Sequence, residues 1–172
     1  MDNDDNSDYF FASDIIRGEN QTKIEAINRG NLLDYKWDIL LNHSDDMWFT
    51  RIGFDKIIVN DMLKYFPDTD GVLHYPDGHA PSLLSYSIIG RKYFERDKYI
   101  YNPAYISLWC DNEAQDVARE RGKYKFIENQ IFEHRHPVWG AAQWDNQYRE
   151  QASYYHIDQQ TYLQRKNNGF SN

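Results

Sequence analysis

The stretch WDILLNHSDDMW, residues 37–48, joins a short apolar run to a polar segment with two adjacent acids. The run at 37–42 is bounded by polar residues on both sides, which is typical of a buried strand rather than of another helix. Asp45 and Asp46 follow it directly, and open α/β sheets bind their ligands beyond the carboxyl ends of strands. The pair therefore predicts either a site for a hard divalent cation or a helix N-cap followed by an acid in the first turn.

The segments on either side of this stretch alternate between helical and strand patterns. Residues 21–33 place apolar side chains on one helical face, with Gly30 as a stop signal, and residues 54–66 return to helical spacing. The later segments are a strand in GVLHY (71–75), a strand in SLLSYSII (82–89), a helix at 111–121 and a strand in KFIENQIF (125–132). Interleaved helices and short strands predict an α/β fold, a three-layer sandwich with a mainly parallel mixed sheet. The last residues, KNNGFSN, are typical of a loose tail.

The composition excludes several classes of function. The 172 residues carry 27 acidic and 19 basic side chains, a net charge of -8, which argues against an electrostatic nucleic-acid binder. No apolar run approaches the ~20 residues of a membrane helix. The N-terminus lacks the basic region of a signal peptide, and the single Cys110 fits a reducing compartment. We expect one soluble cytoplasmic domain over residues 1–172; whether it forms a homo-oligomer is left open.

Two further clusters are candidates for chemistry. The acidic run at 2–8 is either a solvated terminus or a source of one carboxylate for a nucleobase, and Lys23 faces either a phosphate or solvent. Asp111 and Glu113 open the expected helix, where the helix dipole favours acids, but a carboxylate beside Trp109 can also be a desolvated general base.

His134 and His136 share one face if their segment is extended, so both can approach one metal. Two His residues at this spacing, without a third ligand nearby, are more often structural or exposed to solvent. Aromatic residues make up 16% of the chain, and they indicate either core packing or rings on which a sugar or a nucleobase stacks.

Taken in chain order, five motifs resemble the nucleotide-diphospho-sugar glycosyltransferases of the A-type fold, particularly the inverting family 2. DDNSD (4–8) resembles the family's acidic turn after its second strand, and NRG (28–30) resembles its helix signature ARNxG. WDILLNHSDDM (37–47) resembles the strand that ends in the DxD metal motif. IIGRKYFER (88–96) is similar to the segment before the acceptor site, and CDNEAQDVARERG (110–122) resembles EDxDLxxRxxxxG. The resemblance covers nearly the whole chain.

The chain also departs from the family pattern. His43 stands where the fuller acidic motif has its first Asp, and Cys110 replaces the Glu before the catalytic Asp. The family's first strand and helix have no counterpart before Met1, so the resemblance implies an N-terminally short form of the fold. It divides the chain into a partial nucleotide-binding part (1–50) that ends in the metal motif, an acceptor and catalytic part (51–140) and a C-terminal helical tail (141–172).

The resemblance implies transfer of a sugar from a UDP- or GDP-sugar to a hydroxyl of a saccharide or other acceptor, with Mn²⁺ or Mg²⁺ as cofactor. The residues implied for the nucleotide-sugar are Asp4, Asp5, Lys23, Asn28 and Asp45. Those implied for the metal are Asp46, His134 and His136, and those implied for catalysis are Asp111, as the base that deprotonates the acceptor, and Glu113. Trp48, Trp109 and Trp139 stand beside these positions, where a sugar face needs a flat partner.

Two other functions stay open at this stage. A noncatalytic carbohydrate- or partner-binding domain would keep the fold, and a metal-dependent phosphoester hydrolase would use the same acids. A shared cleft that holds Asp45, Asp46 and Asp111 favours the transferase, whereas salt-bridged or scattered carboxylates favour the binding domain.

Overall fold

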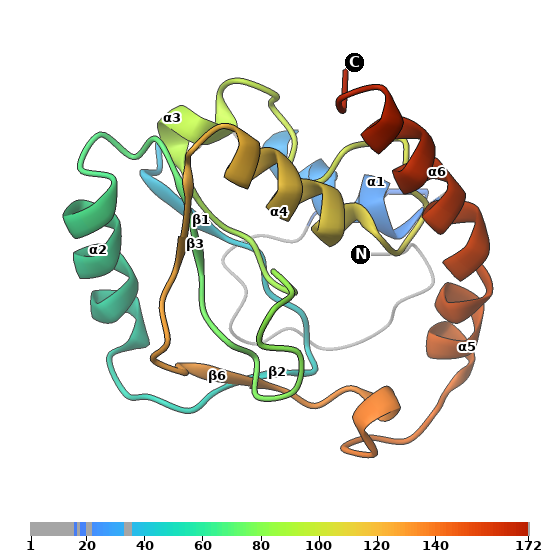
Figure 1. Ribbon diagram of the computed structural model, residues 1–172. Helices are drawn as coiled ribbons and strands as arrows, with labels where there is room; N and C mark the ends of the chain where they lie inside the picture. Colours follow the sequence, from blue (N-terminus) through green and yellow to red (C-terminus); the bar gives the residue numbers. More distant parts are fainter. Residues whose placement is uncertain (1–15, 17, 20–21, 33–35, 172) are drawn as a thin grey trace.

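The computed structural model describes residues 16, 18–19, 22–32 and 36–171 (Figure 1). The helices are α1 (Lys23–Asn28), α2 (Phe54–Tyr65), α3 (Arg91–Phe94), α4 (Cys110–Glu120), α5 (Asn146–Ser153) and α6 (Tyr155–Asn167), with 3₁₀ turns η1 (Arg29–Leu32) and η2 (Pro137–Trp139). The strands are β1 (Ile39–Leu41), β2 (Met47–Phe49), β3 (Val72–His74), β4 (Ile88–Gly90), β5 (Tyr124–Phe126) and β6 (Phe132–His134). None of the helices in this described part of the chain is long and apolar enough to cross a bilayer.

The strands form a four-stranded sheet in the order β1-β4-β3-β5 and a two-stranded ladder of β2 and β6. The α/β class with a mixed sheet is confirmed, but the expectation of a mainly parallel sheet is wrong for the described strands. Only β3 and β5 run parallel, while β4 is antiparallel to both β1 and β3. No helix lies between β3 and β4, so the chain simply turns back at residues 75–87, whereas the path from β3 to β5 includes α4.

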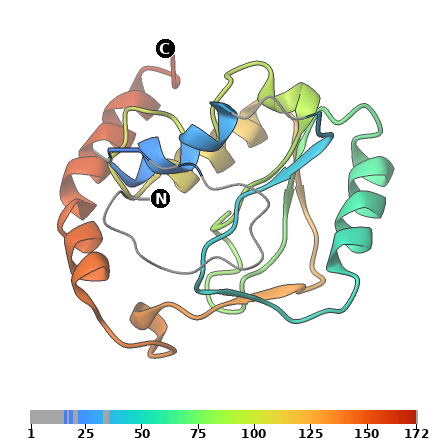
Figure 2. The same ribbon diagram turned by 180° about the vertical axis from the view of Figure 1, so that it is seen from behind.

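Alternation along the strands separates the core into two clusters on opposite faces of the sheet. Leu73 and Ile88 belong to the cluster that contains Met62 of α2, and their neighbours Val72 and Ile89 belong to the cluster around α4 and α6. Figure 1 shows α2 on one side of the sheet and α4 on the other, and Figure 2 shows α1 on the side of α4. The result is three layers.

The helical patterns at 54–66 and 111–121 and the strand at 37–42 are confirmed by α2, α4 and β1. Two strand expectations need correction. SLLSYSII forms a strand only at its end, in β4, and KFIENQIF contains parts of two strands, because β5 joins the large sheet and β6 joins β2.

The expectation of a loose C-terminal tail is also wrong for the described residues. Helix α6 runs to Asn167, and the ring of Phe170 lies 6.0 Å from that of Tyr162 and packs against the α4 cluster. An aromatic side chain that reaches an apolar core orders the segment that carries it.

Candidate functional site

The β2–β6 ladder brings the acidic pair next to the late histidines. Met47 pairs with His134, and the backbone N–H of Arg135 donates to the carbonyl oxygen of Asp46 at 2.8 Å. In this register Asp46 lies in the turn just before β2, opposite Arg135 and one position from His134. Their side chains meet through His134 Nε2 and Asp46 Oδ2, which are 3.1 Å apart.

The Asp46 carboxylate accepts hydrogen bonds from three hydroxyls in addition to His134. Tyr148, at the start of α5, donates to Oδ2 at 3.0 Å, and Tyr86 donates to Oδ1 at 3.3 Å. The hydroxyl of Ser44 also donates to Oδ1. These contacts converge from separate segments of the chain, so the carboxylate is a hub of the tertiary structure.

A second carboxylate lies on the other side of the His134 ring. Asp77 Oδ2 is 3.6 Å from His134 Nδ1, and Asp77 is 1% exposed. The loop after β3 fixes this carboxylate, which accepts from the backbone N–H of His79 (2.9 Å) and of Ala80 (2.6 Å) and from the Ser85 hydroxyl (2.8 Å). The imidazole is thus held between two acids.

The charges of this cluster follow from its geometry. Burial opposes ionisation of Asp46, but the hydrogen bonds from His134 and Ser44 outweigh it and hold the pKa of this carboxyl well below its usual range. Burial also opposes protonation of His134, but the contacts with Asp46 and Asp77 raise its pKa to about 9. His134 is therefore an imidazolium at neutral pH.

Asp111 lies in the first turn of α4, within electrostatic reach of His134 and Lys23. Burial raises the pKa of the Asp111 carboxyl, and the hydrogen bond from the Asn112 backbone N–H (2.9 Å), together with these two positive charges, opposes that rise.

Burial lowers the pKa of the His136 ring, and the positive charges of His134 and Lys23 lower it further. The centre of this ring is 5.3 Å from that of His134. Asp46, His134 and His136 are thus in contact, and Lys23 and Asp111 interact with the histidines electrostatically. We call the residues in contact here, Asp46, Asp77, His134 and His136, the His134 cluster.

Two other predicted residues, Asn28 and Glu113, have structural partners elsewhere. The amide of Asn28 donates to Tyr101 O at 2.7 Å and accepts from Ile100 N at 2.8 Å, so it ties α1 to a loop. Both Glu113 carboxylate oxygens accept from Arg165, at 2.7 and 2.9 Å. The expectation that Glu113 acts as a catalytic group therefore does not fit this geometry, because a buried ion pair saturates the carboxylate.

The three predicted stacking tryptophans differ from one another. Trp109 is half-buried just before α4 with its ring beside that of Tyr162 of α6, and its expected role in sugar stacking stays a prediction. Trp48 is 55% exposed with Arg135 over its ring, and Trp139 is 45% exposed and stacks on His79.

Three acids are predicted for the nucleotide-sugar. Asp45 is exposed in the turn before β2 and interacts electrostatically with Tyr148, while Asp4 and Asp5 lie outside the described residues.

Sequence reasoning missed Asp77, Tyr86 and Tyr148. The segment PDGHAP, residues 76–81, has the composition of a turn, and nothing in it distinguishes a buried acid. The chain contains 14 tyrosines, and nothing in the sequence distinguishes Tyr86 and Tyr148 from the others. Only the fold brings Tyr148 to Asp46, across 102 positions.

The side chains around Asp46 include few donors for the cation that the resemblance implies. In the described ranges, no group of three or more His, Cys, Asp or Glu side chains is arranged to hold a metal ion. Asp46 Oδ2 and His134 Nε2 offer two donors, and Asp77 orients the ring from behind, as a carboxylate does for a metal-bound His. The Asp46 carboxylate is a donor of the type that Mg²⁺ and Mn²⁺ take, whereas the His134 imidazole could bind a cation only after losing its proton, and water and phosphate would have to supply the other ligands.

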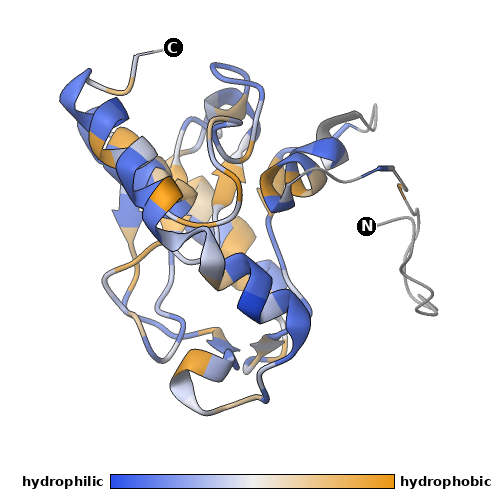
Figure 3. Ribbon diagram, turned by 90° about the vertical axis from the view of Figure 1, so that its right-hand side faces the viewer, coloured by the Kyte–Doolittle hydropathy of each residue, from blue (hydrophilic) through white to orange (hydrophobic). Residues whose placement is uncertain are grey.

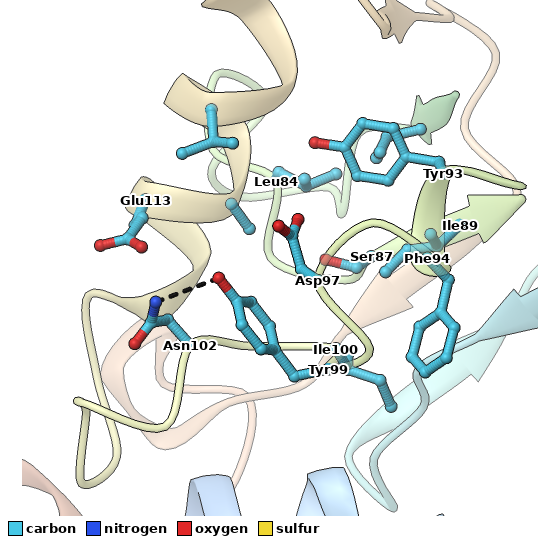
Figure 4. Close-up of a pocket in the computed structure, with 13 residues that line it drawn as sticks. Leu84, Ser87, Ile89, Tyr93, Phe94, Asp97, Tyr99, Ile100, Asn102 and Glu113 are labelled. Atoms are coloured by element: carbon cyan, nitrogen blue, oxygen red, sulfur yellow. Dashed lines mark hydrogen bonds between the residues drawn. The ribbon is translucent and has the colours of Figure 1, made fainter. Parts of the chain in front are cut away.

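A separate cavity of about 40 Å³ lies between α4 and the sheet (Figure 4). Its lining is mostly apolar, with Asp97, Tyr99 and Asn102 among the polar groups, and Asn102 donates to the Tyr99 hydroxyl at 3.1 Å. Ligand sites usually measure several hundred Å³. This cavity is too small for a nucleotide-sugar, so the His134 cluster remains the candidate site.

No protein-family model, no curated protein and no solved structure compared with this chain matches it. The assignment of a function therefore rests on the chemistry and geometry of the residues themselves.

Proposed function

We propose that this chain is a glycosyltransferase-like domain that binds a nucleotide-sugar and transfers the sugar to an acceptor hydroxyl. The observation that carries the proposal is the convergence of predicted residues from separate motifs. Asp46 contacts His134 directly, the ring of His136 lies beside that of His134, and Lys23 and Asp111 interact with these histidines electrostatically. Acids and histidines that were simply exposed to solvent would not be expected to contact one another in this way.

Each residue has a role suited to its surroundings. Asp111 takes the proton of the acceptor hydroxyl, and its raised pKa makes it a better base than an exposed carboxylate. Lys23, exposed at the start of α1, faces the negative phosphates. Asp46 and His134 would hold Mn²⁺ or Mg²⁺, a cation that neutralises charge on the leaving diphosphate when bound.

One observation favours a second candidate, a noncatalytic carbohydrate- or partner-binding domain. Asp46 is salt-bridged to His134 and accepts three hydroxyl hydrogen bonds, and such saturation suits a structural hub. In that case the same residues hold the fold together and no sugar is transferred.

The deciding experiment measures nucleoside diphosphate release from UDP- and GDP-sugars, with and without Mn²⁺. We expect metal-dependent release in the wild-type chain and its loss in Asp111→Asn. The matched control is Asp116→Asn on the same helix, because Asp116 pairs with Lys166 and Tyr162. Titration calorimetry with UDP and GDP completes the test. If the chain shows neither diphosphate release nor metal-dependent binding, the transferase is refuted and the binding domain remains.

A further inference from the structure

One face of α6 packs against the corner that leads into α4. Tyr155, Asp158 and Tyr162 are spaced three and four residues apart and therefore share this face. Figure 1 shows α6 beside α4, and Figure 3 shows hydrophilic and hydrophobic residues mixed on the outer side of α6. The face toward α4 buries two polar side chains, since Asp158 is 0% exposed and Tyr162 is 8% exposed, while Tyr155 at its start is 44% exposed.

The Asp158 carboxylate binds three consecutive backbone N–H groups of the loop before α4. Ile106 N donates to Oδ1 at 3.0 Å, and Ser107 N and Leu108 N donate to Oδ2 at 2.8 and 2.7 Å. No Lys, Arg or His forms an ion pair with Asp158 within the described ranges. The loop N–H groups are therefore the partners that satisfy this buried carboxyl group.

The next residue, Trp109, has a left-handed backbone with φ of 63°, which is unusual for a bulky side chain. It precedes α4 without a side-chain cap. Its ring is held from α6, with centroids 5.5 Å from Tyr155 and 5.2 Å from Tyr162. A strained residue persists only where its surroundings determine its conformation, and here those surroundings are α6.

This corner sets the start of α4, and Asp111 lies two residues beyond Trp109. We propose that Asp158 is a positioning residue: its carboxylate fixes the loop at 106–108 and the left-handed Trp109, and thereby directs Asp111 toward the His134 cluster. The inference deepens the proposed function, because it rests on Asp111 as the base. A purely structural anchor would stabilise the chain without affecting Asp111.

The test compares wild type with Asp158→Asn and with Met62→Ala. Asn keeps the size of Asp but lacks the charge and turns an N–H₂ group toward the loop donors. Met62 is 1% exposed in the cluster on the other face of the sheet, so its truncation destabilises the chain from a distant place. Three quantities are measured: amide hydrogen exchange at 106–112, the ¹³C resonance of the Asp111 carboxyl, and kcat and KM for diphosphate release.

In Asp158→Asn we expect exchange at 106–108 to speed up by about tenfold or more and the Asp111 resonance to move. We expect kcat to fall by about tenfold or more with KM nearly unchanged, since donor binding does not depend on Asp111. Met62→Ala should lower the stability without any of these local effects.

An Asp111 resonance that stays in place in Asp158→Asn, or that moves equally in Met62→Ala, overturns the positioning role. If the wild type releases no diphosphate, the proposed function fails while the exchange and resonance measurements still decide whether Asp158 positions Asp111. The two failures are thus distinguishable.

Discussion

Replacing His134 with Gln should remove a pH-dependent part of the stability. The wild-type imidazolium lies between Asp46 and Asp77, and these contacts raise its pKa to about 9 against 6.5 in the unfolded chain. A His whose folded pKa is raised contributes stability fully below pH 6.5 and loses it as pH rises toward 9. Gln carries no charge at any pH and cannot contribute in this way.

The difference between these pKa values sets an upper limit of about 3 kcal/mol. Solvent reaches part of the ring, since the side chain is 19% exposed, and screening reduces the contribution. We expect about 2 kcal/mol. Neighbouring groups also titrate, so the comparison between the variant and wild type is more informative than either curve alone.

Urea unfolding of both proteins at a series of pH values between 6 and 10 measures this contribution. The free energy of unfolding of wild type should exceed that of His134→Gln at pH 6.5, and the gap should close by about 2 kcal/mol as pH passes 9. Parallel curves across this range would show that the two carboxylates do not stabilise the charged ring.

Two further predictions concern the sheet. Burial, with the charge of Arg119, lowers the pKa of His74 to about 4, so this residue contributes stability above pH 6.5 that is lost as pH falls toward 4. Urea unfolding of His74→Gln should therefore show a weaker loss of stability in acid than wild type, and an unchanged acid slope would contradict the assignment. Gly90→Ala should cost about 1–3 kcal/mol, because an added Cβ meets the backbone oxygen of Thr69. Gly30→Ala is its control, since a Cβ there meets nothing within 4 Å, and equal stabilities of the two variants would refute the clash.

Local patterns were sufficient to predict the longer elements. Helices α2 and α4 repeat their apolar residues over several turns, and the run before Asp45 can be recognised as a strand because polar residues bound it. Strands β2 and β6 have three residues each, too few for a period, and their pairing joins Met47 to His134 across the chain. No local signal specifies such a partner.

The same distinction applies to the candidate site. Asp46 and His134 stand out through motifs in chain order, and the structure brings them together. Glu113 was grouped with Asp111 because both open the same helix, yet two positions along a helix differ by about 200° in direction, so the two carboxylates diverge. The Arg165 partner of Glu113 comes from α6, which the sequence suggested only as a helical tail.

The shortness of the β2–β6 ladder has a thermodynamic consequence. We expect a unit of only three residue pairs to open at a free energy below that of global unfolding, so that its amides exchange through local opening. A ligand that contacts both Asp46 and His134 binds the closed form alone and suppresses this opening by mass action. Slowed exchange at Met47–Phe49 would therefore reveal ligands of this site before any turnover is known.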